Sequence, residues 1–192
     1  MLLDQAGKAS QHILDLLAED HARILKLFDE FQMIRSKDEI DVDRKQRLVE
    51  SACAALIIHS QVEEEIFYPA LRFTPEGFSL VEEAEVEHAV IAAMLAELEL
   101  MDPEEPLYDA KFKVFGDYLR HHVAEEESKL FAQARRSGIA LGPLGGRLSE
   151  RMEELKREFA MPEEEEEQEA LLRIRAAAGI GLYKGAPSSG TS

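Results

Sequence analysis

Two segments of the sequence combine a histidine and a glutamate at a spacing that suits metal binding. His59 lies four residues before Glu63 in HSQVEEE, and His122 lies four residues before Glu126 in HVAEEE. Residues four apart on an α-helix point to the same side and lie about 6 Å apart along the axis. An imidazole and a carboxylate so placed can bind one metal ion or two adjacent ions, and these donors favour iron, manganese or zinc over calcium.

Two more histidines, His21 and His88, lie on apolar helical stripes near the middle of their helices. Because short links make neighbouring helices antiparallel, mid-helix positions meet at one level of a bundle. The sequence therefore predicts a layer of four histidines and two glutamates, which exceeds the ligand number of one tetrahedral zinc ion and suits two six-coordinate ions. The alternative is four hydrogen-bonded core histidines in a structural bundle without metal.

A competing pair, His121 and Glu125, lies one residue out of step with His122 and Glu126. When the two segments are aligned, His122 falls on His59, and the apolar stripe of its helix also passes through His122. Both observations favour His122 and Glu126 as the ligands. We expect His12, near the start of the first helix, to lie on the surface.

The glutamates next to the predicted ligands have a different expected role. Glu64 and Glu127 point about 100° away from Glu63 and Glu126 on a helix. We therefore expect each of them either to orient a ligand histidine or to face solvent. Glu65 is expected to face solvent.

Four long amphipathic patterns position these residues. Apolar residues at spacings of three and four predict helices over residues 10–35, 42–73, 80–101 and 107–136. The links between them are polar or contain proline, and no strand-like alternation is present. The sequence therefore predicts an all-α protein built as an up-down-up-down four-helix bundle.

The chain is predicted to have three parts: the bundle over residues 10–138, an extension over 139–178 and a disordered tail over 179–192. In the extension, GIALGPLGG is expected to be a loop and LSERMEELKREFA a short amphipathic helix. A further helix with an acidic start is expected from Glu163.

Composition restricts the possible partners. The 192 residues carry a formal net charge of −17, which argues against a nucleic acid or an anionic membrane as partner. The single cysteine, Cys53, excludes an intramolecular disulfide and a thiolate metal cluster. No signal peptide and no membrane span are evident, so a cytoplasmic protein is expected.

The segments DHARILKLFDEF, HSQVEEEIFYPAL, EHAVIAAMLAEL and HHVAEEESKLF together resemble the hemerythrin-like, or HHE cation-binding, domain. The resemblance implies a non-haem di-iron site with an oxo or hydroxo bridge. It implies that His21 and His59 bind one iron and that His88 and His122 bind the other. It also implies that Glu63 and Glu126 bridge the two irons. The ligand would be a small molecule such as oxygen, peroxide or nitric oxide, which is bound or processed by redox chemistry.

The sequence departs from the oxygen-carrying members of that family. These have a fifth histidine four residues from the histidine of the third helix, whereas Ala84 and Ala92 flank His88 at that distance. Glu85 or water would fill the position. The four-His, two-Glu set is similar to that of the iron-cluster repair and nitric-oxide-response branch, whose N-terminal cysteine motif is not found in this sequence.

Several alternatives stay open at this point. Manganese or zinc could replace iron, the protein could be an iron or oxygen sensor or an iron store rather than an enzyme, and any protein partner is unknown. Without metal, two neighbouring carboxylates would share the core. We therefore expect the metal-free form to be less stable or to keep those carboxyl groups partly protonated.

Overall fold

The computed structural model describes residues 2–35 and 42–159, with side chains described for residues 13–34 and 42–159. Within these ranges the chain is helical and no strand is present. The prediction of an all-α protein is confirmed for this part of the chain. The expected acidic helix from Glu163, the tail at 179–192 and the side chain of His12 lie outside it.

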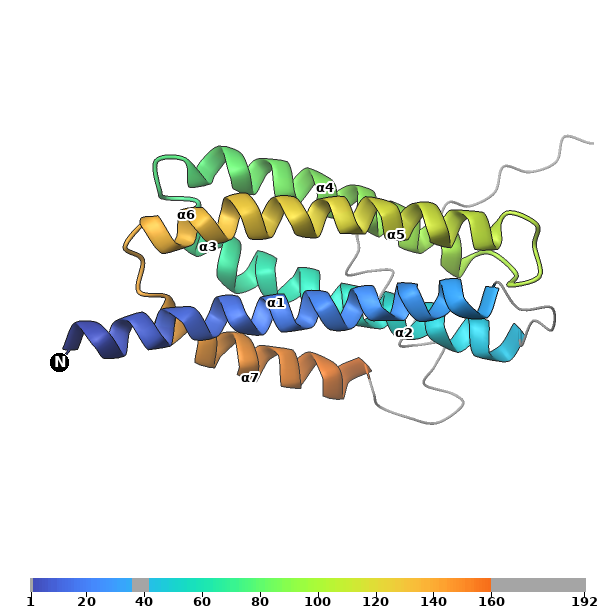
Figure 1. Ribbon diagram of the computed structural model, residues 1–192, viewed down its shortest axis with the longest axis horizontal. Helices are drawn as coiled ribbons and strands as arrows, with labels where there is room; N and C mark the ends of the chain where they lie inside the picture. Colours follow the sequence, from blue (N-terminus) through green and yellow to red (C-terminus); the bar gives the residue numbers. More distant parts are fainter. Residues whose placement is uncertain (1, 36–41, 160–192) are drawn as a thin grey trace, which may run out of the picture. The chain divides into compact units, whose positions relative to one another are not determined.

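The elements follow each other along the described chain (Figure 1). Their bounds are α1 Leu2–Arg35, α2 Val42–Val62, the π-helical turn η1 Glu63–Phe67, α3 Tyr68–Leu71, α4 Gly77–Glu99, α5 Tyr108–Glu125, the π-helical turn η2 Glu126–Leu130, α6 Phe131–Arg136 and α7 Leu141–Phe159. The second and fourth predicted helices are thus each interrupted by one π-turn. α1 packs beside α2, and α4 packs beside α5.

Several observed helix ends differ from the predicted ones. α1 begins at Leu2 rather than at Ser10. α4 begins at Gly77 rather than at Leu80 and ends at Glu99. At the end of α6, Gly138 adopts a positive φ of 69°, the left-handed conformation that commonly ends helices.

The predicted loop GIALGPLGG is wrong, because α7 already begins at Leu141. Pro143 lies in the first turn, where the missing N–H is not needed by the helix. Leu141, Leu148 and Leu155 are all buried at seven-residue spacing, on the side of α7 that packs against α1 and α2. Burying one leucine contributes about 1.5–3 kcal/mol, which outweighs the roughly 1 kcal/mol cost of each glycine in a helix.

Two apolar clusters fill the bundle, and the polar layer lies between them along the helices. On α1, Leu17 belongs to the first cluster and Ile24 to the second, with His21 between them. The same change of cluster occurs on α4 around His88. This arrangement holds the histidines at one level of the bundle. No helix among the described residues is long and apolar enough to cross a membrane.

Candidate metal centre

Each π-turn begins at the glutamate of a histidine–glutamate pair. In η1 the backbone N–H of Tyr68 donates to the carbonyl of Glu63, and in η2 the N–H of Phe131 donates to the carbonyl of Glu126. This bonding places residue i+5 above residue i, whereas in an α-helix the two would point about 140° apart. Tyr68 and Phe131 therefore lie on the same side of their helices as the glutamates.

The structure brings all six predicted ligands together in the buried interior. They form two groups in which the potential donor atoms lie within 4.8 Å of one another. The first group contains His21, His59, Glu63 and Glu126, and the second contains Glu63, His88 and His122. Because Glu63 belongs to both groups, its two carboxylate oxygens can serve two neighbouring cations.

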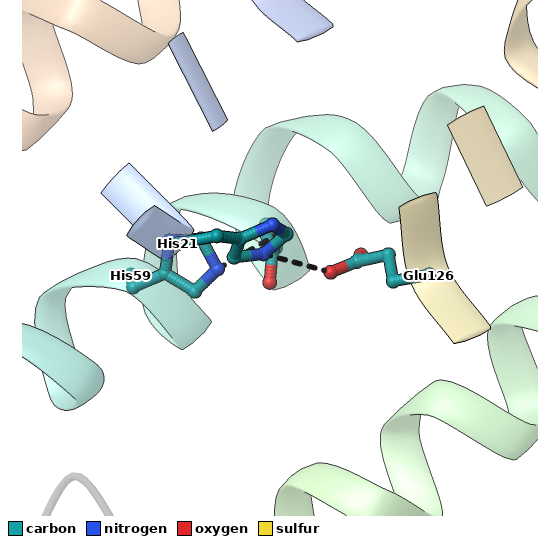
Figure 2. A group of neighbouring side chains, drawn as sticks. His21, His59 and Glu126 are labelled. Carbon is teal, nitrogen blue, oxygen red and sulfur yellow. Dashed lines mark ion pairs between the residues drawn. The ribbon is translucent and has the colours of Figure 1, made fainter. Parts of the chain in front are cut away.

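The Nε2 atoms of the histidines face the two carboxylates. In the first group, the Nε2 of His59 lies 3.2 Å from Glu63 Oε1, and the Nε2 of His21 lies 3.2 Å from Glu126 Oε2. Figure 2 shows His21 and Glu126 facing each other, with His59 beside His21. In the second group, the Nε2 of His88 lies 3.5 Å from Glu63 Oε2.

The other ring nitrogen of each histidine is held by a carboxylate from a different element. The Nδ1–carboxylate distances are 2.9 Å for His21 to Glu127, 3.0 Å for His59 to Asp20, 2.8 Å for His88 to Glu64 and 2.7 Å for His122 to Glu87. An Nδ1–H that donates to a carboxylate fixes the ring and leaves the Nε2 lone pair facing the centre. This arrangement is typical of histidines that bind metals.

Sequence reasoning identified half of these orienting carboxylates. Glu64 and Glu127 contact ligand histidines, which was one of the two roles expected for them. Asp20 and Glu87 were missed. Their signal was present in the sequence, because each directly precedes a histidine of the centre. The helix turn of 100° per residue directs each of them toward the histidine of the next long helix rather than its own neighbour.

Six buried polar atoms at the centre have no hydrogen-bond partner within the described residues. They are His21 Nε2, His59 Nε2, His122 Nε2, Glu63 Oε1 and both carboxylate oxygens of Glu126. Buried polar atoms are nearly always paired, and each unpaired one costs about 1–3 kcal/mol. Imidazole nitrogens and carboxylate oxygens that face one another without partners fit bound cations of the iron, manganese or zinc type.

Charges within the centre balance through the histidines. Burial alone would lower the pKa of His59, but Glu63 and Asp20 outweigh it and hold that pKa well above its usual value. In the same way Glu63 and Glu64 outweigh burial and raise the pKa of His88 to about 9. Burial would raise the pKa of Glu63, but His59 and His88 keep it well below its usual range. The two histidines and Glu63 thus favour each other's charged forms.

Tyr68 is part of the centre, and sequence reasoning missed it. Its hydroxyl oxygen lies 3.0 Å from His88 Nε2 and 3.4 Å from Glu63 Oε2, and the residue is only 1% exposed. Burial, and then the carboxylates of Glu126 and Glu63, raise the pKa of Tyr68 well above its usual value. In an uninterrupted α-helix Tyr68 would point away from the centre. The direction of its side chain therefore depends on the π-turn, which sequence reasoning did not predict. The available signal was the alignment of Tyr68 with Phe131 in the two repeated segments.

Other candidates lie outside the buried layer. Glu85, considered for the open coordination position, forms an ion pair with Arg72 and belongs to neither ligand group. The side chain of His121 is 64% exposed and lies 3.8 Å from Glu125. Glu65 is exposed, as expected, and pairs with Arg151 of α7.

A small cavity of about 10 Å³ adjoins the histidines. It is lined by His21, Ile24, Leu56, His59, Ser60, Ile91, Leu119, His122 and Val123. A space of this size holds about one water-sized molecule. The aliphatic side chains leave the histidines as the main polar groups in its wall.

Comparison with known proteins gives the family of this site. The family model of the Hemerythrin HHE cation binding domain matches residues 12–134, so the chain belongs to the hemerythrin HHE family. A solved structure of a Hemerythrin HHE cation binding domain-containing protein from Mycobacterium kansasii has the same fold, with a TM-score of 0.67 at 23% identity, covering 86% of this chain and 95% of that one.

A curated relative matches part of the chain. It is a protein from Nostoc sp. named DNA nickase, which is 28% identical over 131 residues. The match covers 68% of this chain but only 35% of the relative, so the chain spans about a third of the length of that protein.

Proposed function

We propose that this protein binds two iron ions in the buried centre and uses them to bind, or to process by redox chemistry, a small molecule such as oxygen, peroxide or nitric oxide. In this proposal His21 and His59 hold one ion, and His88 and His122 hold the other. Glu63 would contribute a carboxylate oxygen to each ion, and Glu126 would supply the other carboxylate ligand. The HHE cation-binding family and the two ligand groups support the proposal.

The observation that carries the proposal is the set of six buried, unpartnered donor atoms that face one another. In the observed geometry, a metal-free structural bundle would leave these atoms without hydrogen-bond partners, at a cost of roughly 1–3 kcal/mol each. It would also give no reason for a carboxylate at the Nδ1 of every histidine. Cations account for both features, because they pair with the free lone pairs and need the rings held in one orientation.

Iron is the preferred metal because the donor set mixes four imidazoles with carboxylates and contains no thiolate. Manganese and zinc also bind imidazoles and carboxylates, and they are the alternatives. A pair of iron ions supplies Lewis acidity and electron transfer to a small molecule. The chain supplies the rigid donors, and Asp20 and Glu87 keep the imidazole lone pairs directed at the centre.

The cavity beside His21, His59 and His122 supports a small ligand, close in size to one water molecule. Its volume of about 10 Å³ leaves room for a water-sized molecule but not for an organic substrate. Its aliphatic wall favours uncharged molecules such as oxygen, nitric oxide or hydrogen peroxide. The net charge of −17 supports the further proposal that neither nucleic acid nor an anionic membrane is a partner.

Metal analysis after anaerobic loading with iron(II) tests the proposal. We expect two irons per chain by mass spectrometry, and less than about half an iron per chain would contradict it. The neighbouring histidines provide a matched control: His122→Ala should lose metal, whereas His121→Ala, which changes an exposed ring, should keep it. Equal metal contents in the two variants would contradict the assignment of His122.

A non-enzymatic role as an iron or oxygen sensor, or as an iron store, is the second candidate. It uses the same ligands, so metal content does not distinguish it from the first. Catalytic removal of peroxide by the iron-loaded protein would favour an enzyme. Stoichiometric reaction without turnover, together with a change in absorption on adding oxygen or nitric oxide, would favour a sensor.

A further inference from the structure

The two halves of the centre supply the same kinds of chemical group except at one position. Each half supplies two histidines, one buried glutamate and two orienting carboxylates. At the end of the π-turn, however, the first half has Tyr68 and the second has Phe131. The ring of Phe131 stacks on His21 at a centroid distance of 5.9 Å and brings no donor atom. A hydroxyl group is therefore present on one side of the centre only.

The Tyr68 hydroxyl has the spacing of a metal ligand. Its oxygen lies 3.0 Å from His88 Nε2 and 3.4 Å from Glu63 Oε2, and those two atoms lie 3.5 Å apart. Adjacent ligands of an octahedral ion with bonds of about 2.1 Å are about 3.0 Å apart. The three atoms thus form a triangle close to one face of such an octahedron. When His88 Nε2 binds a cation, it can no longer serve the hydroxyl as a hydrogen-bond partner.

We propose that the Tyr68 oxygen is a ligand of the metal ion held by His88 and His122, in the coordination position for which the sequence provides no fifth histidine. This inference rests on the proposed metal-binding function. It makes the two metal positions chemically different, because Phe131 leaves the corresponding position on the His21 and His59 side without a protein ligand. It also explains why Glu85 is free to pair with Arg72 instead.

Coordination is a substitution that involves no oxidant or reductant. The O–H bond of Tyr68 breaks, an oxygen–metal bond forms, and the proton passes to the buffer. The wild-type protein should therefore release one more proton per chain during metal loading than the Tyr68→Phe variant. A hydroxyl that only donates a hydrogen bond to another ligand keeps its proton and produces no such difference.

The test uses the full chain loaded anaerobically with iron(II) and then oxidised to iron(III). We expect a visible phenolate-to-iron(III) charge-transfer band, with tyrosine ring vibrations in the resonance Raman spectrum excited in that band. Tyr68→Phe should lose the band and bind the second iron at least about 10-fold more weakly, the lower limit for groups that support a metal site. Circular dichroism checks that this variant is folded.

A second variant covers the case in which Tyr68→Phe does not fold. The chain has four tyrosines, so the triple substitution Tyr108→Phe, Tyr118→Phe and Tyr183→Phe leaves Tyr68 as the only one. This variant should keep the band. Two irons per chain without a band in the wild type would overturn the assignment of Tyr68 while the metal-binding function stands. Loss of the band in the triple variant, or its retention in Tyr68→Phe, would also overturn it. Fewer than about half an iron per chain would overturn the metal-binding function itself.

Discussion

The half of the bundle formed by α1 and α2 and the half formed by α4 and α5 hold matching histidines, glutamates and orienting carboxylates but differ in their outer cover. α7 packs along α1 and α2, and Figure 1 shows no helix in the corresponding place beside α4 and α5 among the described residues. The residue before each paired histidine reflects this difference. Ile58 is buried in the same apolar cluster as Leu148 of α7, whereas its counterpart His121 is exposed.

The comparison separates what the metal site requires from what the surroundings require. The donors and their orienting carboxylates are kept in both halves, because each half must hold a cation. The outward residues differ, because one half faces a helix and the other faces solvent. The competing pair His121 and Glu125 is thus a consequence of the uncovered half. In the covered half the same positions read Ile58 and Val62, which cannot bind metal.

The largest expected effect comes from the residue that the two halves share. Glu63 belongs to both ligand groups and Glu126 to one of them, so Glu63→Ala should lower the iron content from two per chain to below about half. Glu126→Ala should lower it less. At metal concentrations about 1,000 times the Kd, losing the metal removes about 4 kcal/mol of stability. Iron analysis and melting temperatures with and without iron measure both effects. Identical losses in the two variants would contradict the special position of Glu63.

The next largest effect is expected from α7, which covers the half formed by α1 and α2. Leu148 of α7 is completely buried, so Leu148→Ala should cost about 2–5 kcal/mol of the free energy of unfolding, as measured by denaturant titration. Because no ligand comes from α7, the folded variant should still bind two irons. Glu150→Ala, a polar position of the same helix that is exposed, serves as the control. A folded Leu148→Ala variant without iron would show that the cover also shapes the centre.

The metal centre was easier to predict from the sequence than its surroundings. His59 with Glu63 and His122 with Glu126 are four residues apart, within stretches that are still regular helix up to the glutamate. Their directions therefore follow from 100° per residue. Tyr68 lies beyond the start of the π-turn, where the rule of 100° per residue no longer holds. No residue type in EEEIF predicts a π-turn. Asp20 and Glu87 act across helices, so their partners depend on how the helices pack.

The fold shows the same limit. The four long amphipathic patterns were visible because many apolar residues repeat at helical spacing. α7 was only half recognised, since Gly142, Pro143 and the glycines after Leu144 are typical of a loop when considered locally. Its first turns form because Leu141 and Leu148 are buried against other helices, and that tertiary gain outweighs local propensity.

The orienting carboxylates should give an intermediate effect that differs between the halves. Asp20 is buried, and the side chain of Glu87 is 20% exposed. Asp20→Asn should weaken metal binding on the His59 side by about 10- to 100-fold, and Glu87→Gln should weaken it less on the His122 side, because solvent can partly replace a carboxylate that water reaches. Competition with a chromophoric chelator measures the two affinities. Glu82→Gln, on the exposed face of α4, should leave both unchanged. Equal, undiminished affinities in all three variants would contradict the role assigned to the Nδ1 hydrogen bonds.

The smallest effect is expected from the surface ion pair that joins α7 to η1. Arg151 of α7 donates from Nε to Glu65 Oε2 at 2.8 Å and from Nη2 to Glu65 Oε1 at 3.3 Å, which joins α7 to η1. The side chains are 26% and 41% exposed, so water and salt screen their attraction. A double-mutant cycle of Arg151→Ala and Glu65→Ala should give a coupling energy of about 0.2–1 kcal/mol, which falls as salt is added. The same cycle for Lys156 and Glu153, a pair within α7 alone, provides the comparison. A coupling above about 2 kcal/mol between Arg151 and Glu65 would mean that this ion pair, rather than the buried leucines, holds α7 to the covered half.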